Sequence, residues 1–283
     1  MKKLTTALFL VLCSLNVLPS TLVDTLYISN YVDSVGGYFA HYRTFHRIDT
    51  IDKANTELHL NENDSLQITI INLDSLTHDF TIDGVLDSNN DIASGDTANF
   101  TLGFSSIGSY RYYSSYAYGK LLSASGIILV GYDNYKKFYW NLFDQQSTLT
   151  DSIAHGWIDS VPPTYHPELF SINNSIYPDI LSDSTGYVVG NVGDTLIIAI
   201  INSGNMAHSL HFHGYHVKIL NAKINNYIVG WDKDTFPVVM KECITVMLIP
   251  DKEGMYPVHD HNLISVNTGG YPGGMITSLM ISP

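Results

Sequence analysis

The chain has 283 residues, of which 45% are hydrophobic and 14% charged, so it is long enough for two globular domains and has the composition of a folded protein. Asp and Glu outnumber Lys and Arg by 27 to 14. The basic residues form no cluster, which argues against nucleic acid or an anionic membrane surface as a partner.

The first twenty residues, MKKLTTALFLVLCSLNVLPS, have the layout of a secretory signal peptide. Two lysines precede an apolar run that starts at Ala7, and the small residue Ser20 closes the segment. We therefore expect residues 1–20 to be a signal peptide and the product to be exported, either periplasmic or secreted. No later stretch approaches the roughly 20 apolar residues of a membrane helix, so no membrane span is expected.

The rest of the chain contains an internal repeat. The segment NENDSLQITIINLDSLTHDFTIDG (61–84) aligns without gaps with NVGDTLIIAIINSGNMAHSLHFHG (191–214), which places His78 opposite His208 and Gly84 opposite Gly214. A second pairing sets GSYRYYSSYAYGKLL, from Gly108, beside GMYPVHDHNLISV, from Gly254. The sequence therefore predicts two homologous domains.

Both copies have the pattern of β structure. Runs such as SLQITII and TLIIAII are rich in Ile, Leu and Thr and are bounded by Asn, Asp and Gly. Because no long amphipathic helix intervenes, we predict an all-β chain with two tandem Greek-key β-sandwich domains. Their expected bounds are 21–131 and 169–283, with a connection at 132–168 whose helix or strand content stays open.

Cysteine usage is sparse. Cys13 lies in the expected signal peptide, so Cys243 is the only cysteine of the mature chain and no intramolecular disulfide is possible. Within ECITVMLI, Cys243 is expected to be a small buried apolar residue.

Four positions are histidine in the second copy only. The alignment sets Thr81, Asp83, Tyr113 and Ser115 of the first copy against His211, His213, His259 and His261 of the second. Residues i and i+2 of a strand point to one face, so the four imidazoles converge if the two strands are neighbours. Imidazole is largely neutral near pH 7 and binds transition metals through its free nitrogen. The four histidines are therefore a predicted metal site.

His208 and Asp260 point to the opposite face of the same strands. One interpretation is a buried His–Asp pair that satisfies its own charges. The other is a second metal site formed by His208, Asp260 and Met275.

These motifs resemble the multicopper oxidases, including laccases, and the related copper nitrite reductases. HSLHFHGYH, DKDTFPVV, GMYPVHDHNLI and GGM follow one another as in the last domain of that family. The resemblance implies cupredoxin-like domains, copper as cofactor, and half of a trinuclear copper cluster at the four histidines. It also places His208 at the blue-copper histidine, Met275 at the axial position and Asp260 where the family has cysteine. Without that thiolate there is no blue copper centre.

The degenerate first copy cannot supply the other half of the cluster. The expected function is thus an exported copper-binding protein, a copper-dependent oxidoreductase with an incomplete or mononuclear centre acting on a small molecule or metal ion. A copper-buffering or metal-stabilised binding protein without turnover is the alternative, and a homo-oligomer such as a trimer is a possible assembly.

Overall fold

The computed structural model describes residues 19–47, 53–158 and 160–283. Most of the expected signal peptide lies outside these residues, so the signal peptide and export stay predictions. Within the described residues, no helix is both long and apolar enough to cross a membrane.

The first repeat forms a sandwich of two four-stranded sheets. One has the order β2-β1-β4-β6 and the other β3-β8-β7-β5. The strands are β1 (Thr21–Val35), β2 (Tyr38–His46), β3 (Leu58–Leu60), β4 (Ser65–Asn72), β5 (Thr81–Ile82), β6 (Thr97–Gly103), β7 (Gly108–Tyr113) and β8 (Ser125–Val130).

The second repeat forms a larger sandwich. Its sheets have the orders β10-β9-β12-β17-β14-β15 and β11-β19-β18-β13-β16. The strands are β9 (Lys136–Gln145), β10 (Leu169–Ile172), β11 (Val188–Asn191), β12 (Leu196–Asn202), β13 (His208–Phe212), β14 (Val217–Ala222), β15 (Asp232–Lys233), β16 (Thr235–Val238), β17 (Cys243–Leu248), β18 (Gly254–Asp260) and β19 (Ile276–Ser282).

The two sandwiches share one topology, which confirms the all-β class and the repeat. The order β2-β1-β4-β6 reappears as β10-β9-β12-β17, and β3-β8-β7-β5 reappears as β11-β19-β18-β13. β1 is parallel to β4, and β9 is parallel to β12 in the same way. The segment 132–168, expected to connect the domains, thus includes a central strand of the second sandwich, and the proposed domain bounds stay a prediction.

The sandwiches pack against each other through β12 and its neighbours. β4 alternates buried and more exposed residues, whereas every residue of β12 is buried. The reason is that Ile198 and its even-numbered neighbours face the core of the second sandwich, while Ile197, Ala199 and Ile201 face the first repeat. Cys243 lies in the same interface at 3% exposure, as expected for a small apolar residue.

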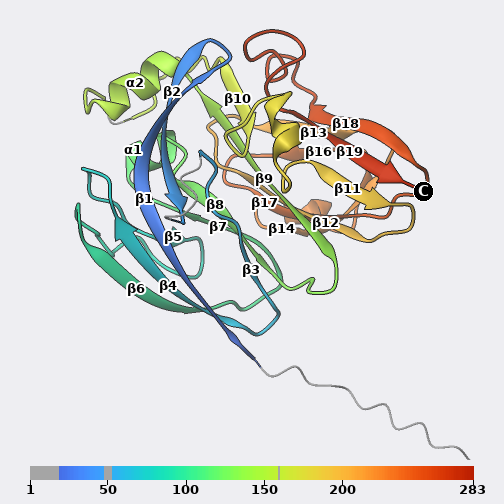
Figure 1. Ribbon diagram of the computed structural model, residues 1–283, viewed down its shortest axis with the longest axis horizontal. Coiled ribbons are helices and arrows are strands. Elements are labelled where there is room, and N and C mark those ends of the chain that lie inside the picture. Colours follow the sequence, from blue (N-terminus) through green and yellow to red (C-terminus); the bar gives the residue numbers. More distant parts are fainter. Residues whose placement is uncertain (1–18, 48–52, 159) are drawn as a thin grey trace, which may run out of the picture.

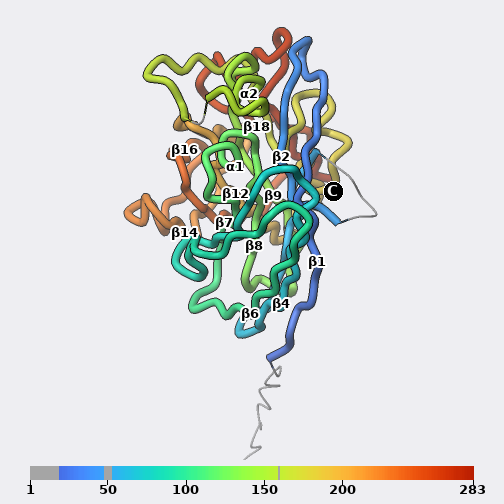
Figure 2. Tube along the Cα trace, turned by 90° about the vertical axis from the view of Figure 1, so that its left-hand side faces the viewer, coloured from blue at the N-terminus to red at the C-terminus, as the bar shows by residue number. Residues whose placement is uncertain are grey.

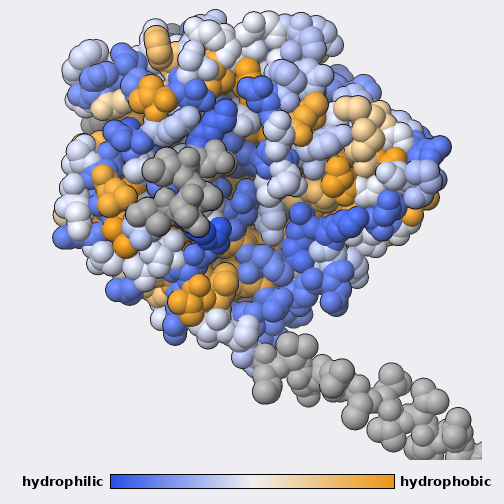
Figure 3. Space-filling model, viewed as in Figure 1, coloured by the Kyte–Doolittle hydropathy of each residue, from blue (hydrophilic) through white to orange (hydrophobic). Residues whose placement is uncertain are grey.

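Short helices complete the fold. α1 (Ala117–Leu121) and α2 (Ser147–Ala154) lie on the side of the first repeat, and two 3-10 helices span Asp179–Ser182 and Asn226–Ile228. Figures 1 and 2 show α2 near the tip of the β1–β2 hairpin, where His41 of β2 contacts Asp151 at 3.1 Å. On the face drawn in Figure 3, apolar side chains form small scattered groups among polar ones.

Candidate metal centre

The two histidine-bearing strands of the second sandwich are direct neighbours. β13 pairs antiparallel with β18, and His211 stands opposite His259 in the register. His213 and His261 follow two residues after these, so all four rings lie on one side of the sheet. The strands that carry His211 and His259 are therefore neighbours, which is the condition for the predicted metal site.

The four rings lie close to one another. The ring-centroid distances from His211 are 4.6 Å to His213, 5.7 Å to His259 and 5.6 Å to His261. The His213 and His259 rings are 5.1 Å apart, and their Nε2 atoms are 3.0 Å apart. Among the described residues, no three His, Cys, Asp or Glu side chains already stand in a geometry that could hold one ion, so binding requires rotation of side chains. His213 and His261 are the exposed members of the cluster.

Two of the rings are oriented by partners on their Nδ1 atoms. His211 Nδ1 is 2.7 Å from the Thr235 hydroxyl, and His259 Nδ1 is 2.8 Å from the carbonyl oxygen of Asp260. A carbonyl only accepts, so His259 donates from Nδ1, and its Nε2 lone pair faces His213 Nε2. Such partners fix the tautomer and orientation of metal-binding histidines in general.

One ring of the cluster, that of His213, resists protonation. Burial, followed by the charges of His211, His259 and His261, lowers the pKa of His213. Because neutral imidazole is the form that binds metals, this shift keeps His213 competent at slightly acidic pH.

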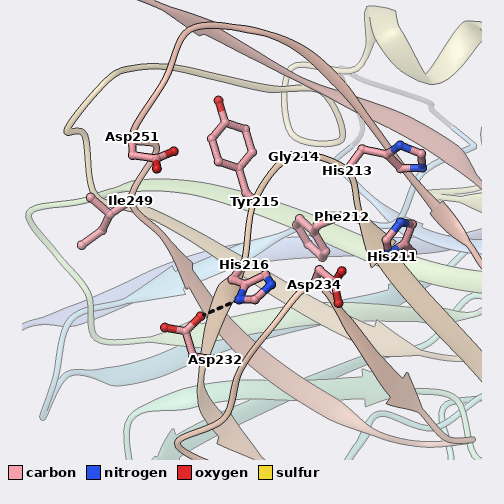
Figure 4. A pocket seen from close by; sticks show the side chains of 10 residues that line it. All are labelled: His211, Phe212, His213, Gly214, Tyr215, His216, Asp232, Asp234, Ile249 and Asp251. Carbon is pink, nitrogen blue, oxygen red and sulfur yellow. Dashed lines mark ion pairs between the residues drawn. The ribbon is translucent and has the colours of Figure 1, made fainter.

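A cavity of about 650 Å³ opens beside His211 and His213. Figure 4 shows these two rings along one side of it, with Asp232 and Asp251 on the opposite side and Asp234 close to His211. Its other lining residues include Asp232, Asp234 and Asp251. These three carboxylates, called the acidic mouth below, favour entry of cations over anions.

A second cavity, of about 390 Å³, lies on the other flank and has a different character. It is lined by His213 and His259 together with mostly apolar residues such as Met255, Leu263 and Ile276. His213 therefore borders two cavities, one lined mainly by polar residues and the other mainly by apolar residues.

The first repeat holds no such cluster at the corresponding place. Thr81 of β5 stands opposite Tyr113 of β7, just as His211 stands opposite His259. Tyr113 donates a hydrogen bond of 2.7 Å to Asp83, and Arg111 pairs with the same carboxylate at 3.0 Å. This face carries a network of ion pairs and hydrogen bonds in place of imidazoles.

His208 and Asp260 meet in the interior of the second sandwich. Their side chains are fully buried, and His208 Nδ1 lies 2.8 Å from Asp260 Oδ2. The other nitrogen, Nε2, faces Asp144 Oδ2 at 3.5 Å, a distance at which the attraction is mainly coulombic. Asp260 also accepts the backbone N–H of Ser209 through Oδ1. These contacts favour the buried ion pair over a second metal site.

Met275 lies in the core of the same sandwich at 0% exposure. Its carbonyl oxygen accepts the backbone N–H of Asp260 at 3.2 Å. Its side chain packs among the aliphatic core residues.

The first repeat also buries a histidine beside a carboxylate, without any histidine cluster nearby. His78, the counterpart of His208, places Nε2 2.9 Å from Asp74 and Nδ1 3.0 Å from Ser114. Arg43 pairs with Asp74 at 2.5 Å, and all these groups are buried. In both repeats a buried histidine thus contacts a buried carboxylate, although Ser114 stands at the place of Asp260 in the first repeat. Such a contact is expected of a structural element.

The ion pair predicts a pH dependence of stability in the metal-free protein. Burial favours the neutral ring, but Asp144 and Asp260 outweigh it and raise the pKa of His208 from 6.5 to about 9. A raised pKa in the folded state stabilises the fold fully below about pH 6.5, and this contribution disappears as the pH rises through about 9. The melting temperature should therefore fall between pH 6.5 and pH 9.5, and the fall should be smaller in His208→Gln. An equal fall in both proteins would contradict the assignment.

Asp260 sets the acid limit of the same pair. Burial raises its pKa, yet the hydrogen bond and charge of His208 lower it below 3.8 overall. Its contribution is thus present above about pH 3.8 and disappears as the pH falls through the lowered value.

Three features of the site could not be located by histidine spacing. Asp144, the second carboxylate beside His208, comes from β9 in the segment expected as a connection. The acidic mouth combines residues from β15 and two loops. The third feature is Thr235, which orients His211. It belongs to the DKDTFPVV motif, but the resemblance gave this motif no role.

The comparisons with known proteins agree with the motifs. Residues 160–272 match the family model of multicopper oxidases, which confirms the resemblance in the second repeat. Among curated proteins, none matches the sequence.

Solved structures show the same fold. A blue copper oxidase from Nitrosomonas europaea has a TM-score of 0.75 at 20% identity over 93% of this chain and 86% of its own. A copper nitrite reductase from Nitrosomonas europaea has a TM-score of 0.70 at 17% identity, over 93% of this chain and 94% of its own. A laccase from Botrytis aclada has a TM-score of 0.68 at 14% identity, over 93% of this chain and 53% of its own. Both sandwiches therefore have the cupredoxin-like fold of these three structures.

Proposed function

We propose that this chain is an exported copper-binding protein and a copper-dependent oxidoreductase with an incomplete copper centre at His211, His213, His259 and His261. The observation that carries the proposal is the convergence of these four rings in the repeat that matches the multicopper oxidase model. The periplasm or the outside of the cell is the proposed location.

The donor set fits copper. Imidazole suits copper, and the Irving–Williams order places copper(II) above the other divalent first-row metals. The Nε2 atoms of His213 and His259, which are 3.0 Å apart, are the two donors that would hold the ion first.

When bound, copper supplies one-electron redox chemistry and an exchangeable coordination position. The chain itself supplies orientation and access. Thr235 and the Asp260 carbonyl hold two rings in place, and the acidic mouth attracts cations. Three carboxylates also disfavour an anion such as nitrite entering from that side, so a metal ion or a neutral small molecule is the proposed substrate.

The missing thiolate limits the chemistry. Asp260 occupies the place of the blue-copper cysteine, and its oxygen atoms already bind His208 and Ser209. No relay site for electrons is thus available at this position. The substrate must therefore deliver electrons directly to the histidine centre. Because no relay site supplies further electrons, we do not propose the four-electron reduction of oxygen.

Turnover should depend on the cluster. With dissolved oxygen as the electron acceptor, reduced by two electrons to hydrogen peroxide, the copper-loaded protein should oxidise a phenol or a reduced metal ion. His259→Ala should lower this rate at least about 100-fold, because it removes one of the four proposed copper ligands. His166→Ala is the matched control, since His166 is exposed and lies outside the cluster. Initial rates with equal copper loading test this, and equal rates for both variants would contradict a catalytic role for the cluster.

A copper-buffering protein without turnover is the second candidate. The specific observation in its favour is the replacement of the electron relay by the buried His208–Asp260 pair. If this candidate is right, full copper loading gives no turnover, and chelation lowers the melting temperature by several degrees.

A homo-oligomer such as a trimer is the proposed assembly, and it would place the exposed cluster against another subunit. Because each subunit has Thr81, Asp83, Tyr113 and Ser115 in place of the missing histidines, an eight-histidine centre would still not form.

A further inference from the structure

A small cavity between the two repeats is lined by cations. It has a volume of about 320 Å³ and takes Arg111 from the first repeat and Lys223 and Lys241 from the second. The remaining lining residues are Asp83, Tyr110, Ile224 and Cys243. The cavity lies outside both histidine pockets and shares no residue with them.

Arg111 lies in this cavity with unused hydrogen-bonding capacity. It is 5% exposed, and its Nε has no hydrogen-bond partner among the described residues. Its guanidinium lies 4.2 Å from the centre of the Tyr113 ring and pairs with Asp83, whose side chain is 53% exposed. A buried guanidinium that is only partly satisfied costs free energy, which an anion beside it would offset.

Lys241 occupies a backbone position that the sister repeat gives to glycine. Lys241 has φ of 64°, and its N–H donates to the carbonyl of Asn202. In the first repeat, the N–H of Gly95, with φ of 83°, donates to the carbonyl of Asn72 in the same way. A lysine in the left-handed region is disfavoured relative to glycine, and this position brings the Lys241 side chain to the lining of the cavity.

Arg111 is paired with Asp83, whereas neither lining lysine forms an ion pair within the described residues. Glu242 is completely buried, and its two oxygens accept the backbone N–H groups of Lys223, Ile224, Asn225 and Cys243. The Lys223 amine lies 3.8 Å from the centre of the Tyr110 ring, which holds it at the cavity. Asp83 is thus the one lining carboxylate, against three lining cations.

We propose that this cavity binds a small organic anion, a carboxylate or phosphate attached to an apolar body. The charged group meets Arg111, Lys223 and Lys241, and the apolar body lies against Ile224 and Tyr110. Because the lining comes from both repeats, the bound anion stabilises the interface between them.

Calorimetric titration of the metal-free wild-type protein tests this site without involving copper. The probes are phenyl phosphate, benzoate, inorganic phosphate and neutral phenol. We expect saturable binding of the two organic anions with one site per chain, weaker binding of inorganic phosphate and none of phenol. Failure of both organic anions to bind overturns the proposal, and equal binding of inorganic phosphate overturns the role of the apolar body.

Variants locate the binding. Lys241→Gly, which restores the residue of the sister repeat and should fold at least as well, and Lys223→Met should each weaken phenyl phosphate about tenfold, or about 1.4 kcal/mol. Asp83→Asn should strengthen it, because it removes the competing carboxylate. Lys218→Met is the matched control, since Lys218 is an exposed lysine of β14 outside the cavity. If the lysine variants bind like the control, the site is not this cavity.

Discussion

Asp260→Ala should lower the free energy of unfolding by about 3–5 kcal/mol, because it leaves a buried imidazolium without its closest counter-charge. The side chains of His208 and Asp260 are both fully buried and 2.8 Å apart. The substitution also removes the acceptor of the Ser209 N–H. Urea unfolding of the metal-free protein measures the loss.

Asp232→Ala is the matched control for this variant. Asp232 faces His216 at 3.6 Å, but their side chains are 71% and 62% exposed, so the control should change stability by less than about 0.5 kcal/mol. If His208 and Asp260 instead formed a second metal site, the loss would appear mainly in the copper-loaded protein. An equal loss with and without copper is expected of the ion pair.

The second large effect concerns copper affinity. His211→Ala should weaken copper binding by more than about 100-fold, since loss of a ligand exceeds the 10- to 100-fold effect of losing an outer partner. Thr235→Val should fall within that 10- to 100-fold range, because it removes only the 2.7 Å contact that orients the His211 ring. His166→Ala should leave affinity unchanged.

Competition with a chelator of known copper affinity measures all three variants. The expected order of loss is His211→Ala, then Thr235→Val, then the control. A Thr235→Val protein that binds copper like wild type would show that the hydroxyl does not orient the ring.

Sequence periodicity predicted the parts of this fold that depend on local alternation and on the repeat. The alignment of His78 with His208 and of Thr81 with His211 holds in the strand register, because homologous strands have the same neighbours. Burial of β12 on both faces was not predictable from one copy, since it depends on the packing of the two repeats.

Only the part of the candidate site that lies on two strands with HxH spacing was predictable from the sequence. The facing of His211 and His259 follows from HxH spacing once the strands are neighbours. Asp144 beside His208, by contrast, comes from a strand about 60 residues earlier in the chain, and no local pattern links them. The cationic cavity was also missed, because Arg111 and Lys241 are brought together only by the interface between the repeats.

The most direct test of the central claim is the amount of copper bound per chain after loading and desalting. The mature protein is compared with the His211→Ala/His213→Ala variant, with the far-ultraviolet circular dichroism of both checked for folding. Our account predicts about one copper or more per wild-type chain and none in the folded variant. No copper in either protein, or equal copper in both, would contradict a copper centre at the four histidines.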